Sequence, residues 1–177
     1  GMLNDSGMLF PAPVGASAAS YPSLPLHTRI RSAWNVAGPG SVVSDLIARY
    51  PAYANIMNDL GSASLALGRI YPKDRFGTAT FQQDMVYSDF SYGDFHPEVK
   101  AATGDARKAL LNKLWRQDLA NFTNVHKSAP ANMGYYIPYG RNMIGSHTLS
   151  VLTFDSTGIA DLKKQSLNDL VNDVTNT

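Results

Sequence analysis

The strongest constraint on the fold is an amphipathic stretch between Gly104 and Phe122. Its apolar side chains return every three or four residues, which is the period of an α-helix with one buried face. A face that carries Trp and Phe must be covered, so we expect the other elements to pack around this helix. The expected buried face consists of Leu111, Leu114, Trp115, Leu119 and Phe122.

One acidic residue, Asp118, falls on the flank of this apolar face. A buried carboxylate needs a polar partner, because the loss of its hydration is costly. Two kinds of partner are open at this point, the guanidinium of Arg141 or a tyrosine hydroxyl. We expect Asp118 to make a structural hydrogen bond rather than to act in catalysis.

Residues 1–40 have a different composition from the rest of the chain. They contain half of the ten prolines, separated by runs of Gly, Ala and Ser. Proline removes amide donors and blocks helix formation, so we predict an extended arm with little regular structure. The arm precedes a single domain of residues 41–177. Its apolar side chains could pack on this domain or on a neighbouring subunit, and the sequence leaves both open.

The remaining patterns predict an α+β fold. Two helices are expected to meet at Pro51, and a last helix is expected over residues 157–174. Residues 135–137 and 147–154 are strand candidates because they are rich in apolar and β-branched residues. We therefore predict a mainly helical domain with a small antiparallel hairpin, preceded by the extended N-terminal arm.

Composition excludes several classes of function. The net charge of +1 and the lack of a polybasic run argue against a nucleic-acid partner. The absence of cysteine excludes disulfides, thiol catalysis and Cys-type zinc sites. No apolar run approaches the ~20 residues of a membrane span. No nucleotide-binding or metal-binding motif is present, so we expect no cofactor and no metal.

The densest group of acidic and imidazole side chains lies in residues 84–98. Their spacing matches no ligand loop of a calcium or zinc site. We expect the stretch to be mostly loop, with these side chains in solvent. The group consists of Asp84, Asp89, Asp94, His96 and Glu98.

The leading functional hypothesis is a non-enzymatic structural or assembly subunit, in a homo-oligomer or a larger complex such as a virion. Charged residues make up only 16% of the chain, against ~25% in typical soluble domains. Tyr and Arg are enriched where proteins bind one another. Contacts with partner subunits are expected from the arm and the Tyr-rich segments, namely Phe10, Tyr21, Trp34, Tyr135, Tyr136, Tyr139 and Arg141.

The alternative hypothesis is a small enzyme or a ligand-binding domain with a site between residues 84–98 and 135–147. Histidine is the side chain best suited to exchange protons near neutral pH. A pocket that joins the two segments and holds a buried charged group would favour this alternative. Its catalytic candidates are Asp94, His96, Tyr136 and His147.

Overall fold

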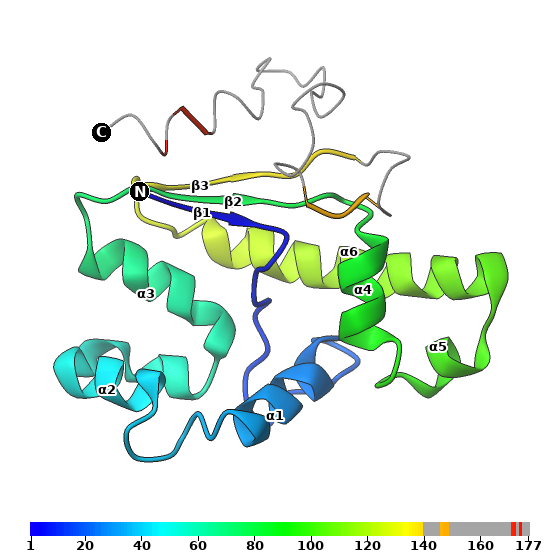
Figure 1. The fold of residues 1–177 in the computed structure, drawn as a ribbon, viewed down its shortest axis with the longest axis horizontal. Coiled ribbons are helices and arrows are strands. Elements are labelled where there is room, and N and C mark those ends of the chain that lie inside the picture. The colour runs from blue at the N-terminus through cyan, green and yellow to red at the C-terminus, as the bar shows by residue number, and fades with distance from the viewer. Residues whose placement is uncertain (140–145, 149–170, 173, 175–177) are drawn as a thin grey trace.

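The structure is a computed structural model, and it describes residues 1–139, 146–148, 171, 172 and 174. It combines a three-stranded sheet with one long helix and several short ones (Figure 1). In chain order the elements are β1 (Met2–Asp5), α1 (Leu24–Ala33), α2 (Val42–Arg49), η1 (Pro51–Met57), η2 (Leu60–Ser62), α3 (Ala63–Ile70), β2 (Phe76–Ala79), α4 (Met85–Tyr92), α5 (Pro97–Ala101), α6 (Gly104–His126) and β3 (Met133–Tyr136).

The described strands form one sheet in the order β1-β2-β3, and both pairs are parallel. Leu3 pairs with Gly77, and Gly77 pairs with Gly134. Parallel neighbours need a long crossover connection. Helices supply both crossovers here, with α1 to α3 before β2 and α4 to α6 before β3.

The parallel sheet shows that the predicted antiparallel hairpin was wrong. Tyr135 lies in β3 and pairs with Thr78 of β2, which is far away in the sequence. The prediction joined two strand candidates that are neighbours in the sequence, and hydrophobic pattern alone does not reveal a partner across three helices. Residues 149–154 of the second candidate lie outside the described residues, as do residues 157–170 of the predicted last helix.

The long helix α6 confirms the prediction made from its apolar period. Leu111, Trp115, Leu119 and Phe122 are buried along one face. The indole Nε1 of Trp115 donates a 2.9 Å hydrogen bond to the carbonyl oxygen of Phe81. Burial of this ring therefore leaves no unpaired donor. Figure 1 shows α6 running alongside the sheet, where the rings of Phe122 and of Tyr135 in β3 meet at 5.8 Å.

Residues 1–40 contribute β1, α1 and part of the core. Phe10 is 1% exposed, and its ring meets that of Trp115 edge-on at 4.9 Å. The amide of Ala12 donates a 3.0 Å hydrogen bond to Oδ1 of Asp59. This part of the arm therefore packs on elements of its own chain. The proline-rich composition pointed to an extended segment, and the structure places the helix α1 within it.

Residues 81–98 form helices α4 and α5 where we expected mostly loop. The carboxylate of Asp84 accepts a 2.8 Å hydrogen bond from the amide of Tyr87 and so caps α4. Pro97 occupies the first turn of α5, where its missing amide costs nothing. Local capping thus overrides the weak periodicity of this stretch.

Candidate functional site

The carboxyl ends of the parallel strands gather at one edge of the sheet. Ser6 follows β1 directly, and its amide donates a 2.8 Å hydrogen bond to the carbonyl oxygen of Ala79, the last residue of β2. Beyond β2 and β3, the amide of Gln82 donates to the carbonyl oxygen of Pro138. Residues 146–148 lie at the same edge (Figure 1). Ligands of open parallel sheets bind outside this edge, so it is the first place to look for a site.

A carboxylate and an imidazole meet at this edge. Oδ2 of Asp84 lies 2.8 Å from Nδ1 of His147. The carboxyl group of Asp84 is 0% exposed, whereas the imidazole of His147 is 24% exposed. The pair therefore links a fully buried acid to a ring that reaches solvent.

The surroundings of Asp84 determine its charge. Burial raises the pKa of its carboxyl group, because removal from water disfavours the charged form. Hydrogen bonds from the Tyr87 amide and from His147 lower that pKa in opposition. The position of Asp84 at the N-terminus of α4 also favours a negative charge. The carboxyl group is thus held in place by one oxygen and presents the other to His147.

This arrangement fixes the orientation of the imidazole. A carboxylate oxygen accepts hydrogen bonds, so Nδ1 of His147 is the donor in the pair. In the neutral form of an imidazole whose Nδ1 is the donor, Nε2 carries no proton and can accept one from a reacting group. A carboxylate that selects this tautomer is the arrangement used by histidine general bases.

Backbone strain is concentrated at the same edge. Ser6, Ser146 and Thr148 have positive φ angles of 57°, 57° and 52°, which L-residues other than Asn and Asp rarely adopt. Among the residues that the structure describes, Asn35 is the one further non-glycine residue with positive φ. The amide of Thr148 donates a 3.0 Å hydrogen bond to Oγ of Ser6. Such strain tends to accumulate at functional sites, where it fixes the direction of side chains.

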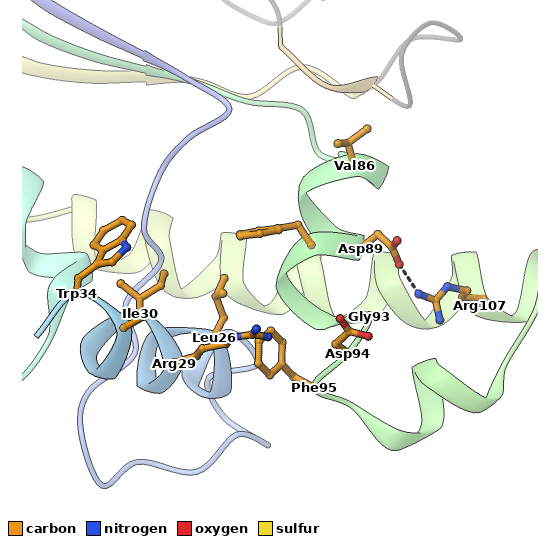
Figure 2. A pocket seen from close by; sticks show the side chains of 12 residues that line it. Leu26, Arg29, Ile30, Trp34, Val86, Asp89, Gly93, Asp94, Phe95 and Arg107 are labelled. Carbon is orange, nitrogen blue, oxygen red and sulfur yellow. Dashed lines mark hydrogen bonds and ion pairs between the residues drawn. The ribbon is translucent and has the colours of Figure 1, made fainter.

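A groove lies between α1 and α4, and Val86 near the start of α4 is one of its lining residues (Figure 2). Its volume is about 580 Å³, which falls in the range of small-molecule sites. Trp34 is 69% exposed on one side of it, and Phe90 is 61% exposed on the other. Arg29 places its guanidinium 6.0 Å from the ring centre of Phe95, and Figure 2 draws the ion pair between Arg107 and Asp89.

A row of rings connects the groove to the Asp84–His147 pair. Phe90 stacks on Tyr87 with 6.0 Å between ring centres, and Tyr87 stacks on His147 at 6.5 Å. The Tyr87 hydroxyl donates a 2.7 Å hydrogen bond to the carbonyl oxygen of Met8, which fixes the central ring. These ring contacts link Phe90 of the groove lining to the pair, whereas Asp84, Tyr87 and His147 are not among the residues that line the groove.

The four catalytic candidates from the sequence have separate surroundings. His147 pairs with Asp84, and Asp94 lines the groove. His96 is buried, with Nε2 2.9 Å from the carbonyl oxygen of Pro22 and Nδ1 3.4 Å from a carboxylate oxygen of the exposed Glu98. Tyr136 is buried in a small core cluster beside the sheet. His147 is thus the candidate that pairs with a fully buried carboxylate, and it does so at the edge of the sheet.

The expected contact residues also differ in accessibility. Phe10 and Tyr136 are buried in the core of their own chain, and Tyr21 is partly buried. Trp34, Tyr135 and Tyr139 are exposed, and Trp34 lines the groove. Arg141 lies outside the described residues.

Sequence reasoning missed two residues of this region. Asp84 was expected to be a solvated acid of a loop, and that prediction was wrong because the residue caps α4 and is buried. An Asp directly before the apolar residues that begin a helix, here Met85 and Val86, is a capping signal that could have indicated this. Ser6 carries no comparable signal, because its conformation and its neighbours arise from contacts with distant residues.

A second buried carboxylate, Asp118, lies inside the core. Its Oδ2 accepts 2.8 Å hydrogen bonds from the Tyr92 hydroxyl and from the Ser23 amide. Burial raises the pKa of this carboxyl group to about 6, although those hydrogen bonds oppose the shift. The expected tyrosine hydroxyl is therefore one of its partners, and the contact joins α6, α4 and the start of α1.

Comparison with protein-family models, with curated proteins and with solved structures gives no significant match to this chain. Within the described ranges, no three His, Asp or Glu side chains come together as a metal site would require. No described helix has the length and apolar character needed to cross a bilayer. The site must be interpreted from its own geometry.

Proposed function

We propose that this chain is a hydrolase that cleaves an ester, with His147 as the general base. The observation that carries the proposal is the 2.8 Å contact between Nδ1 of His147 and the buried carboxylate of Asp84. That contact leaves Nε2 able to take a proton from a hydroxyl as it attacks a carbonyl carbon. Asp84 is a positioning residue, since it acts through the ring of His147.

The groove supports an ester with an apolar part. Its exposed aromatic walls, Trp34 and Phe90, suit an aryl or acyl group. The rings of Phe90 and Tyr87 continue from the groove to His147. A substrate that lies along these rings presents its ester bond to the imidazole.

The test measures kcat/KM on p-nitrophenyl acetate, butyrate and octanoate. We expect His147→Ala to lower kcat/KM by about 10³-fold, the order of magnitude that a positioned base supplies. Free imidazole should restore part of this activity, because it can replace the missing base. His96→Gln is the matched control, since His96 also pairs with a carboxylate, Glu98, but is buried against the backbone of Pro22 away from the sheet edge.

Two results would reject the proposal. One is a wild-type protein that hydrolyses none of the three esters above the buffer rate. The other is a His147→Ala variant with wild-type kcat/KM. Circular dichroism of both variants shows whether a loss of activity comes from unfolding.

A second candidate function is contact with a partner subunit, and one observation favours it. Trp34 and Phe90 expose large apolar surfaces on the two sides of one groove. Exposed aromatic side chains of this size are typical of protein interfaces. We propose that this chain, if it is a structural or assembly subunit, binds its partner through this groove.

Solution mass tests this second candidate. Sedimentation equilibrium of the wild type should give a mass above that of one chain, and Trp34→Ala should reduce it. Tyr71→Ala is the control, because Tyr71 is exposed and is not part of the groove lining. A wild type that is monomeric at all concentrations would contradict self-assembly through the groove.

A further inference from the structure

We propose that Ser6 is the nucleophile of this site and forms a covalent acyl intermediate. The inference rests on the proposed esterase function and names the group that His147 activates. It starts from three contacts of Ser6, with Ala79, Asp5 and Thr148, the last of which is the neighbour of His147 in the chain.

The first argument is position. Ser6 follows the last residue of β1, and its amide donates to the carbonyl oxygen of Ala79 at the end of β2. Its Oγ accepts a 3.0 Å hydrogen bond from the amide of Thr148, the residue next to His147. The hydroxyl therefore lies beside the backbone that carries the general base. A nucleophile at the carboxyl end of a parallel strand is well placed for a substrate above the edge of the sheet.

The second argument is conformation. Ser6 has φ = 57°, which costs about 1–2 kcal/mol for a residue with a Cβ. A glycine would adopt this angle without cost, yet the position holds a hydroxyl-bearing residue. In other hydrolases a strained turn after a strand holds the nucleophilic serine and exposes its Oγ to the substrate. The strain at Ser6 has the same place in the fold, although Ser6 itself is only 3% exposed.

The third argument is the state of the hydroxyl. Oγ of Ser6 donates a 3.1 Å hydrogen bond to Oδ1 of Asp5, its neighbour in the chain. That bond is long and local, so it is easily exchanged. The reaction requires Oγ to break its hydrogen bond to Asp5 and to direct its proton toward Nε2 of His147. Catalytic hydrogen bonds often form only when the substrate is bound.

The reaction then proceeds in two balanced steps. Oγ of Ser6 forms a bond to the carbonyl carbon while its proton passes to Nε2 of His147. The bond from that carbon to the alcohol oxygen breaks, and the alcohol leaves with the proton. Water next attacks the acyl carbon and gives a proton to Nε2. The bond to Oγ breaks, Oγ takes the proton, and the acid is released.

The test uses phenylmethanesulfonyl fluoride, which a nucleophilic serine attacks at sulfur with release of fluoride. We expect the full chain to gain one sulfonyl group, and peptide mapping to place it on Ser6. His147→Ala should abolish the labelling, since the base is lost. Ser146→Ala should label normally, because Ser146 shares the positive φ but not the proposed role. Labelling at another residue, or equal labelling in His147→Ala, overturns the inference.

A second variant, Ser6→Gly, guards against a folding artefact. Glycine suits φ = 57°, so the variant should fold as well as the wild type. We expect its kcat/KM to fall by about 10³-fold. Wild-type activity in Ser6→Gly together with inactive His147→Ala would overturn the role of Ser6 and leave a general-base esterase that uses water. Wild-type activity in both variants would reject the proposed function itself.

Discussion

The two buried carboxylates of this protein show what separates a structural acid from a functional one. Asp84 and Asp118 are both 0% exposed, and burial raises the pKa of both. The described partners of Asp118, a tyrosine hydroxyl and a backbone amide, stay neutral in the core. The partner of Asp84 is an imidazole that reaches solvent. Burial alone therefore does not mark a site, whereas a buried acid that holds an accessible titratable ring does.

The largest expected difference between the two acids is in activity. Asp84→Asn should lower kcat/KM on p-nitrophenyl butyrate by about 10³ to 10⁴-fold, because an amide no longer selects the productive tautomer of His147. Asp118→Asn should leave kcat/KM within about twofold, since it only changes contacts in the core. Equal losses in the two variants would contradict the distinction.

For stability we expect the opposite order, with the larger effect at Asp118. Asp118→Ala should lower the free energy of unfolding by about 4 kcal/mol, because the buried Tyr92 hydroxyl and Ser23 amide lose their acceptor. Asp84→Ala should cost about 1–2 kcal/mol, as expected for the loss of an N-cap. Urea unfolding followed by tryptophan fluorescence measures both. A larger loss in Asp84→Ala would show that Asp84 has the more structural role.

The pH dependence of stability should separate Asp118 from a buried histidine. The pKa of Asp118 is raised to about 6, so its proton binds more tightly in the folded state. Its contribution to the free energy of unfolding therefore falls as pH rises from about 4 to 6, by up to about 3 kcal/mol. The pKa of His27 is lowered to about 4, mainly by burial. Its contribution has the opposite sign and rises over nearly the same pH range.

In the wild type, these two opposing contributions to the pH dependence of the free energy of unfolding should nearly cancel. His27→Gln should expose the falling contribution of Asp118, and Asp118→Asn should expose the rising contribution of His27. Urea titrations at pH 4, 5, 6 and 7 measure each slope. Parallel pH profiles for the two variants would show that these groups do not titrate as described.

Losses of stability below that of Asp118→Ala are expected for the two tyrosines beside the acids. Tyr92→Phe should cost about 2 kcal/mol, because its hydroxyl donates to a charged acceptor, Asp118. Tyr87→Phe should cost about 1 kcal/mol, since its hydroxyl donates to the neutral carbonyl oxygen of Met8. Thermal unfolding at pH 7 compares them. A larger loss in Tyr87→Phe would reverse the assignment of the stronger hydrogen bond.

Local patterns predicted the helical part of the fold. The apolar period of residues 104–122 predicted α6, and the amphipathic stretch before Pro51 predicted α2. The buried position of Trp115 and the tyrosine partner of Asp118 followed from the same face. Each of these features depends on residues within a few turns of one helix, where spacing in the sequence equals spacing in space.

The sheet and the candidate site could not be predicted in this way. β1 pairs with β2 across about 70 residues, and four-residue strands carry little periodicity of their own. Of the pair at the sheet edge, His147 was a candidate and Asp84 was not, because their contact joins residues 63 positions apart. Ser6 reaches that edge only through β1. A site assembled from residues that are far apart in the sequence produces almost no local sequence pattern from which it could be predicted.

The separation of about 70 residues between β1 and its partner β2 has a consequence for biosynthesis. Residues 2–5 can pair only after residues 76–79 have left the ribosome. At about 5–20 residues per second, the first strand waits for about 4–15 s without its partner. Phe10 waits longer, until Trp115 has been made. The nascent chain therefore emerges with apolar residues uncovered, and the region around Ser6 is among the last parts of the protein to take shape.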